Sequence, residues 1–173
     1  MPAILRDRFA IGTTRDLGCT NEVVHEALHN TALVRELVDA LNDRNIVVQH
    51  RASNALKKIQ RSDPALLEPF AKRILQRALA TDHVHTLWNL TIILGELPLR
   101  GRDKALATDL MFEFLSSPST LQRAFALTAL ANYAQDDPPL RKRIHPILSL
   151  ALTDPKASIR ARARKLMKKI KSS

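Results

Sequence analysis

A pattern of apolar residues recurs along the chain at a period near 37 residues, and it restricts the fold more than any other feature of the sequence. Each copy begins at a turn residue and continues with apolar or small residues at offsets of 9, 12, 13 and 16 positions. The four copies begin at Asp43, Thr81, Ser117 and Asp154, which lie 38, 36 and 37 positions apart. A period of this length that persists over four copies is typical of repeat proteins.

Each copy predicts an amphipathic helix, because these offsets place the apolar side chains on one helical face. The positions are Ala52, Ala55, Leu56 and Ile59 in the first copy, Leu90, Ile93, Leu94 and Leu97 in the second, Ala126, Ala129, Leu130 and Tyr133 in the third, and Ala163, Leu166, Met167 and Ile170 in the last. Val48 and Ile159 extend the pattern at offset 5 in the first and last copies. With only four glycines in 173 residues, the chain favours helices over many short strands.

A second helical segment precedes each of these helices and joins it by a tight turn containing Asp, Asn, Ser or Pro. Two prolines, Pro69 and Pro146, fall inside such leading segments and are expected to bend them. The chain then divides into an N-terminal cap, 1–30, and four helix pairs at about 31–62, 63–99, 100–136 and 137–173. We expect the first twenty residues either to pack irregularly as a cap or to remain partly mobile. The segment "NEVVHEALH" is expected to be either a separate helix or the start of the next one.

The segment "LALTDPKASIRARARKL" resembles a HEAT repeat, in which a leucine-rich first helix is followed by an Asp-Pro turn, an Ile-Arg pair and small residues on the second helix. The resemblance covers residues 31 to 171 and is strongest in the first and last units. It implies an all-α, right-handed α-solenoid of about four two-helix repeats with an irregular N-terminal cap. In such solenoids the second helices line a concave surface, which commonly binds a protein partner.

Composition and charge exclude several classes of protein. Cys19 is the only cysteine, so no internal disulfide can form, and a cytoplasmic location is expected. No apolar run approaches the roughly 18 residues of a membrane helix, so no membrane partner is expected. The net charge of +10 is concentrated at one end, since residues 155–173 hold eight basic residues and no acidic one.

The sequence predicts no catalytic residue, cofactor or metal, and therefore no enzyme. No glycine-rich phosphate loop or nucleophile motif is present. His25 and His29 share a helical face, but no third ligand accompanies them at metal-binding spacing.

The first hypothesis for function is a non-catalytic protein-interaction module, a scaffold or adaptor. Its contacts are expected on exposed positions of the second helices. The candidate residues are Trp88, Ile92, His50 and Asn54.

The alternative is binding of nucleic acid, or of an acidic protein surface, by the last helix. Its basic residues all lie outside the apolar face: Arg160, Arg162, Arg164, Lys165, Lys168 and Lys169. A plainer reading is that a terminal repeat needs a polar outer face for solubility. A third hypothesis is a HEAT-like DNA glycosylase, but that family uses clustered tryptophans and a catalytic carboxylate, and this chain has one tryptophan.

Overall fold

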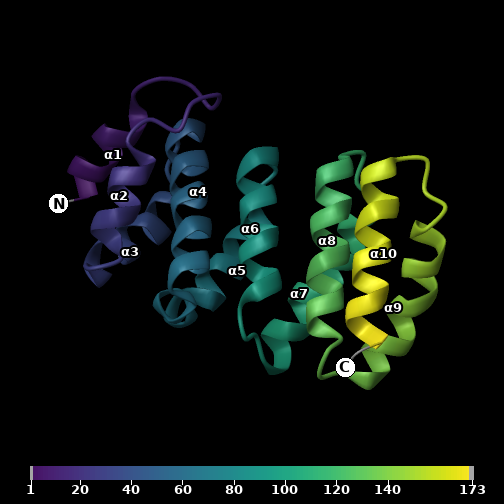
Figure 1. Cartoon of the computed structure of the whole chain (residues 1–173). Helices are drawn as coiled ribbons and strands as arrows, with labels where there is room; N and C mark the ends of the chain where they lie inside the picture. The colour runs from purple at the N-terminus through teal and green to yellow at the C-terminus, as the bar shows by residue number, and fades with distance from the viewer. Residues whose placement is uncertain (1, 172–173) are drawn as a thin grey trace. The chain divides into compact units, whose positions relative to one another are not determined.

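The computed structural model describes residues 2–171, and within this range every regular element is a helix (Figure 1). This confirms the prediction of an all-α chain. The helices divide into two compact units, Met1–Leu99 and Arg100–Ser173. The division falls at the border that the sequence predicts between the second and third repeats.

The first unit is organised around its longest helix, α4. Its elements are α1 (Pro2–Ala10), α2 (Thr20–Ala27), α3 (Thr31–Ala40), α4 (Ile46–Ser62), two 3-10 turns (Pro64–Leu66 and Glu68–Phe70), α5 (Ala71–Ala80) and α6 (Val84–Glu96). Helix α4 contacts α1, α2, α3 and α6, and Figure 1 shows α2, α4 and α6 side by side in that order. A helix with neighbours on several sides buries more than one face, and α4 is buried along most of its length.

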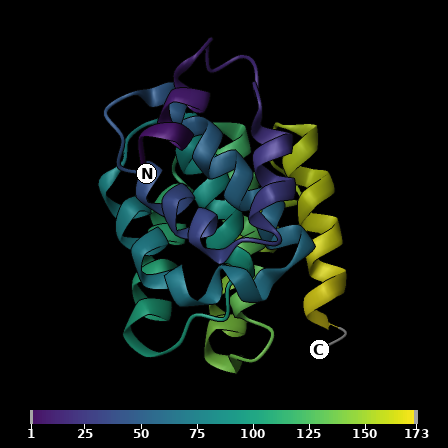
Figure 2. The same ribbon diagram turned by 90° about the vertical axis from the view of Figure 1, so that its left-hand side faces the viewer.

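The N-terminal segment is more regular than its sequence predicts. Residues 2–10 form α1, which begins with Pro2 at a position where the missing N–H costs no hydrogen bond. Leu5 and Phe9, four residues apart, share one face and are buried. Irregular packing is therefore a wrong prediction for residues 2–10. It is right for residues 11–19, whose loop arches between α1 and α2 in Figure 2.

A cap at Asn30 separates α2 from α3 and decides between the two alternatives for this region. The Asn30 side-chain oxygen accepts hydrogen bonds from the N–H groups of Ala32 at 3.1 Å and Leu33 at 3.4 Å. Its backbone is extended, with φ −144° and ψ 95°. An asparagine in this conformation satisfies the first free N–H groups of a helix, so α3 begins here as a new helix.

The prediction that Pro69 bends the leading helix of the second pair is wrong. Pro64 begins one 3-10 turn, Pro69 is the second residue of another, and the α-helix starts only at Ala71. Proline lacks the N–H that would continue a helical hydrogen-bond ladder, which explains why a pair of short turns replaces the first part of the helix. Pro146, in contrast, lies inside a continuous helix as predicted.

The second unit consists of four helices in the described residues. They are α7 (Gly101–Phe114), α8 (Thr120–Tyr133), α9 (Pro138–Ala151) and α10 (Ala157–Lys171). Helix α8 packs against α7, α9 and α10, and α9 also packs against α10. Figure 1 shows α8 and α10 side by side within this unit.

The periodic apolar positions form the cores of both units. All of them are buried except Met167, which is half-buried. Burying one large apolar side chain contributes about 1.5–3 kcal/mol. The core positions predicted from the period are thus confirmed in α4, α6, α8 and α10.

Candidate functional site

Helix α10 is held in the second unit by its apolar face, which fixes the direction of its basic residues. Ile159, Ala163, Leu166 and Ile170 are buried between α8 and α9. The preceding turn is fixed by Asp154, whose carboxylate accepts from the Lys156 N–H at 2.8 Å and pairs with Arg123 at 3.2 Å. The remaining faces of the helix therefore point away from this core.

The six predicted nucleic-acid-binding residues form what we call the α10 basic face. They are Arg160, Arg162, Arg164, Lys165, Lys168 and Lys169. The last four are exposed, and the first two are half-buried.

Arg160, Arg162 and Lys169 bind neighbouring oxygens. Arg160 donates to the carbonyl groups of Asp154 and Pro155 at 2.8 and 2.9 Å. Arg162 donates to the Thr128 hydroxyl at 3.1 Å, and Lys169 to the Asn132 amide oxygen at 2.8 Å. These oxygens carry no net charge, so these bonds order the side chains without neutralising them.

The prediction noted the lack of carboxylates in the last helix but missed that α4 and α8 share it. Helices α4, α8 and α10 contain no Asp or Glu, although together they carry twelve Lys and Arg residues, four on α4, one on α8 and seven on α10. The acidic residues lie on other helices and in turns. The signal was present in the sequence, but it appears only when charge is counted helix by helix.

The first unit brings His50, His83, His85 and Trp88 together in what we call the His–Trp cluster. His50 lies on α4, and the other three lie at or just before the start of α6. The His85 ring centroid lies 5.3 Å from that of His50, 5.7 Å from that of His83 and 5.0 Å from that of Trp88. All three pairs meet edge to face, a preferred geometry for aromatic rings.

The environment of this cluster keeps His50 neutral near pH 7. Burial is the main reason that the pKa of His50 is lowered to about 4, and the charges of His85, His83 and Lys57 act in the same direction. Burial also lowers the pKa of His83. His83 Nδ1 shares a hydrogen bond of 2.8 Å with the Thr86 hydroxyl.

A chain of hydrogen bonds connects Lys57 to the backbone beside His50. Lys57 Nζ donates to Asn89 Oδ1 at 2.7 Å, Asn89 Nδ2 donates to Ser53 Oγ at 3.0 Å, and Ser53 Oγ donates to the His50 carbonyl at 2.8 Å. Burial, together with repulsion from Arg61 and Lys58, lowers the pKa of Lys57.

Several polar atoms of this region are buried without a hydrogen-bonding partner among the described residues. They are His50 Nδ1, Asn54 Oδ1 and Trp88 Nε1. Buried polar groups are nearly always hydrogen-bonded, and an unpaired one costs about 1–3 kcal/mol. These three atoms lie on α4 and α6, which pack against each other.

Two of the four predicted protein-binding residues are not exposed, which corrects that expectation. His50 is 9% exposed and Asn54 8%, because α4 lies between α2 and α6 and buries this face. Trp88 and Ile92 are half-buried on α6. The structure brings His50 and Trp88 together through His85, a residue that the prediction did not include.

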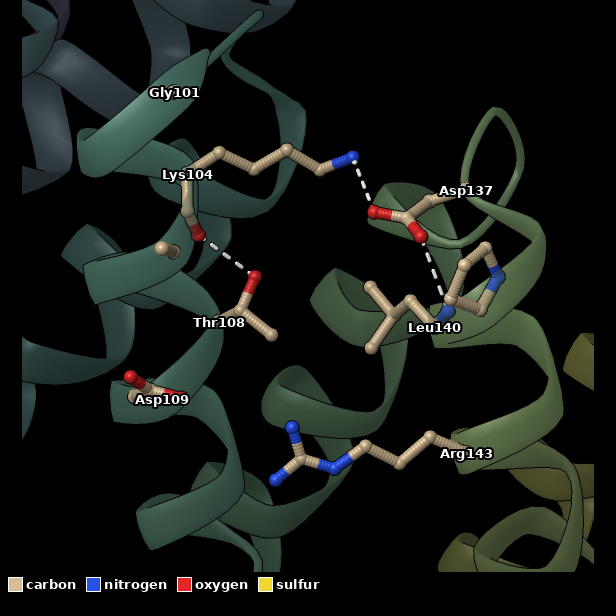
Figure 3. Close-up of a pocket in the computed structure, with 9 residues that line it drawn as sticks. Gly101, Lys104, Thr108, Asp109, Asp137, Leu140 and Arg143 are labelled. Atoms are coloured by element: carbon tan, nitrogen blue, oxygen red, sulfur yellow. Dashed lines mark hydrogen bonds and ion pairs between the residues drawn. The ribbon is translucent and has the colours of Figure 1, made fainter.

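A pocket of about 370 Å³ lies between α7 and α9 (Figure 3). On one side Lys104 pairs with Asp137 at 3.0 Å, and Asp137 also accepts from the Leu140 N–H at 3.1 Å. The guanidinium of Arg143 lies 3.8 Å from the centroid of the Phe112 ring. Because Lys104 and Asp137 neutralise each other, we interpret these contacts as joining α7 to α9.

The described residues contain no group of three or more His, Cys, Asp or Glu side chains placed to hold a metal ion. In the same part of the chain, no helix combines the length and the hydropathy needed to cross a bilayer.

Comparison with known proteins finds no family model that matches the chain and no curated protein with significant similarity to it. The resemblance to HEAT repeats therefore rests on the residues of this chain alone.

Proposed function

We propose that the protein is a non-catalytic binding module of HEAT-like repeats and that its partner is nucleic acid. The repeat arrangement is supported by contacts between successive second helices. Asn89 bonds Ser53 at a separation of 36 residues, and Lys169 bonds Asn132 at a separation of 37. Contacts at one period are expected where neighbouring units of a right-handed solenoid stack in register.

The observation that carries the choice of partner is the α10 basic face. Four of its six side chains are exposed, and no acidic residue occurs on the helix. Solubility alone calls for mixed charges, whereas a surface of one sign attracts an oppositely charged polymer. Phosphates spaced along a nucleic acid match several cations on one helix, and each neutralised phosphate releases counterions that favour binding.

Fluorescence anisotropy with a labelled duplex and a labelled single strand at about 50 mM salt tests the proposal. The test variant replaces exposed residues of α10: Arg164→Glu, Lys165→Glu and Lys168→Glu. The matched control makes the same charge change on exposed residues of other helices: Lys72→Glu, Arg102→Glu and Lys142→Glu. Circular dichroism checks that both variants remain helical.

We expect the α10 variant to lose at least about tenfold in affinity, roughly 1.4 kcal/mol, and the control to lose much less. An equal loss in both variants would mean that only the net charge matters, which contradicts a site on α10. Polyglutamate serves as a competitor. If it displaces the nucleic acid with equal affinity, an acidic protein replaces nucleic acid as the proposed partner.

A protein partner is the second candidate, and a different observation favours it. An apolar pocket of about 360 Å³ in the second unit is lined by Leu115, Leu127, Ile147 and Leu150, among others. Leu150 is 75% exposed, the most exposed large apolar residue of this unit. Such a patch is typical of a protein-binding surface.

Leu150→Asp would weaken capture of a protein partner without changing anisotropy with nucleic acid.

A further inference from the structure

We propose that helices α8 and α10 together bind single-stranded nucleic acid, with a base stacked on Phe125 and phosphates held by Arg162, Lys165 and Lys169. The inference deepens the proposed function, on which it rests, by naming the form of the nucleic acid. It also gives a role to α8, whose accessible side chains the proposed function does not use.

The accessible side of α8 is a narrow stripe of side chains. Its members are Leu121, Phe125, Thr128 and Asn132, which follow one another at intervals of four, three and four positions and therefore share one helical face. Leu121 is 48% exposed, and the other three are half-buried. Most other residues of the helix are buried in the core of the second unit. The stripe is thus the side of α8 that a ligand can reach.

Two hydrogen bonds place cations of α10 beside this stripe. Arg162 Nη1 donates to Thr128 Oγ1 at 3.1 Å, and Lys169 Nζ donates to Asn132 Oδ1 at 2.8 Å. Lys165 lies three positions after Arg162 and four before Lys169, so it shares their face of α10. Because α8 and α10 pack side by side (Figure 1), the stripe and these three cations form one surface.

The ring of Phe125 decides which form of nucleic acid suits this surface. Phe125 precedes Thr128 by three positions on the stripe, and Thr128 in turn binds Arg162. Proteins that bind single strands combine cations that follow the phosphates with aromatic rings on which the bases stack. In a duplex the bases are already stacked on one another, so a surface ring meets no free base face. The cations would serve either form, but the ring favours a single strand.

The charges and the length of the surface fit a strand of several nucleotides. Neither α8 nor α10 carries a carboxylate that would compete with phosphates for the cations. Arg162 has five N–H donors, of which Thr128 takes one, so its guanidinium can also bind phosphate oxygens. The stripe runs for about 17 Å from Leu121 to Asn132, since a helix rises about 1.5 Å per residue.

Fluorescence anisotropy at about 50 mM salt with three labelled probes tests the proposal. The probes are a single strand of about 16 nucleotides, an abasic strand with the same number of phosphates and no bases, and a duplex. The protein is the full chain, as wild type and with Phe125→Leu or Phe125→Tyr. The matched control is Phe114→Leu, which changes another half-buried phenylalanine, on α7. Circular dichroism checks that every variant remains helical.

We expect the wild type to bind the single strand at least about fivefold more tightly than the abasic strand, because stacking of one base contributes about this factor. Phe125→Leu should remove most of this difference by weakening the single strand alone. Phe125→Tyr keeps an aromatic ring and should keep the difference. Phe114→Leu should leave all three affinities unchanged.

The comparison of the two strands by the wild type needs no variant, and equal affinities for them would overturn the proposal. An equal loss for both strands in Phe125→Leu would also overturn it, because the ring would then only support the fold. In either case the strands still bind, and the proposed function stands. If none of the three probes binds, the proposed function is wrong, and the single-strand inference is wrong with it.

Discussion

Arg51 is the residue on which the N-terminal part of the first unit depends most. Its side chain is 1% exposed, and its guanidinium donates to the carbonyl of Phe9 at 3.0 Å and to that of Ile11 and pairs with Asp16. Gly18 has φ +48°, and a Cβ there would lie 2.8 Å from the Arg51 Cζ. One buried side chain thus joins α4 to the end of α1 and to the loop that follows it.

We predict that Arg51→Met lowers the free energy of unfolding by about 3 kcal/mol, since a hydrogen bond to a charged group contributes about 1.5–3 kcal/mol and buried carbonyls are left unpaired. Urea denaturation measures the change. Arg73→Met is the matched control. Arg73 pairs with Asp39 on the surface, with both side chains about half exposed, and this pair should contribute about 1 kcal/mol or less. Equal losses in the two variants would contradict the role of Arg51.

His50 predicts how stability depends on pH. Its folded-state pKa of about 4 is below the ordinary value of 6.5, so the unfolded chain takes up this proton first as the pH falls. The contribution of neutral His50 is complete above pH 6.5 and is lost between 6.5 and 4. When the pH falls from 7 to 5, we expect the free energy of unfolding to decrease less in the His50→Gln variant than in the wild type. Urea denaturation at each pH measures this decrease. Parallel curves would show that His50 does not titrate in this window.

At the scale of the helix, the two faces of α10 have different roles that substitution separates. Leu166→Ala should lower the free energy of unfolding by about 2–5 kcal/mol, because it leaves a cavity in the core. Lys165→Ala, one residue earlier on the exposed side, should change it by no more than about 0.5 kcal/mol. Thermal and urea denaturation of both variants measure the difference. A large loss from Lys165→Ala would contradict the assignment of that face to binding.

The sequence predicts best those helices whose apolar residues are periodically spaced, because this spacing alone determines which face is buried. The predicted core positions of α4, α6, α8 and α10 are buried, with Met167 half-buried. Boundaries were less predictable. The Asn30 cap and the 3-10 turns at Pro64 and Pro69 depend on local hydrogen bonds, which compete with continuation of a helix.

At the scale of the whole molecule, burial of His50 and Asn54 could not be predicted from α4 alone. It depends on which helices pack beside α4, and α2 and α6 both do. The His–Trp cluster was missed for the same reason. His50 lies 33 residues before His83 in the sequence and 35 before His85. Contacts between helices distant in sequence require the packing arrangement, which periodicity does not supply.

The division of the molecule leads to a prediction about fragments. Residues 1–99 should fold alone and melt cooperatively, because the core of this unit is formed by its own helices. Circular dichroism during heating measures the helix content and the transition of the fragment. A fragment without helix or without a cooperative transition would contradict the independence of this core.

The most direct test of the central claim is the salt dependence of duplex binding by the full chain. The logarithm of the association constant should fall with the logarithm of salt concentration by about 0.9 for each phosphate neutralised. We predict a slope of about −3 or steeper for the wild type. A neutral α10 variant (Arg164→Gln, Lys165→Gln, Lys168→Gln) should give a slope shallower by about 2 to 3. A slope that stays the same in the variant, or no binding at about 50 mM salt, would contradict a nucleic-acid site on α10.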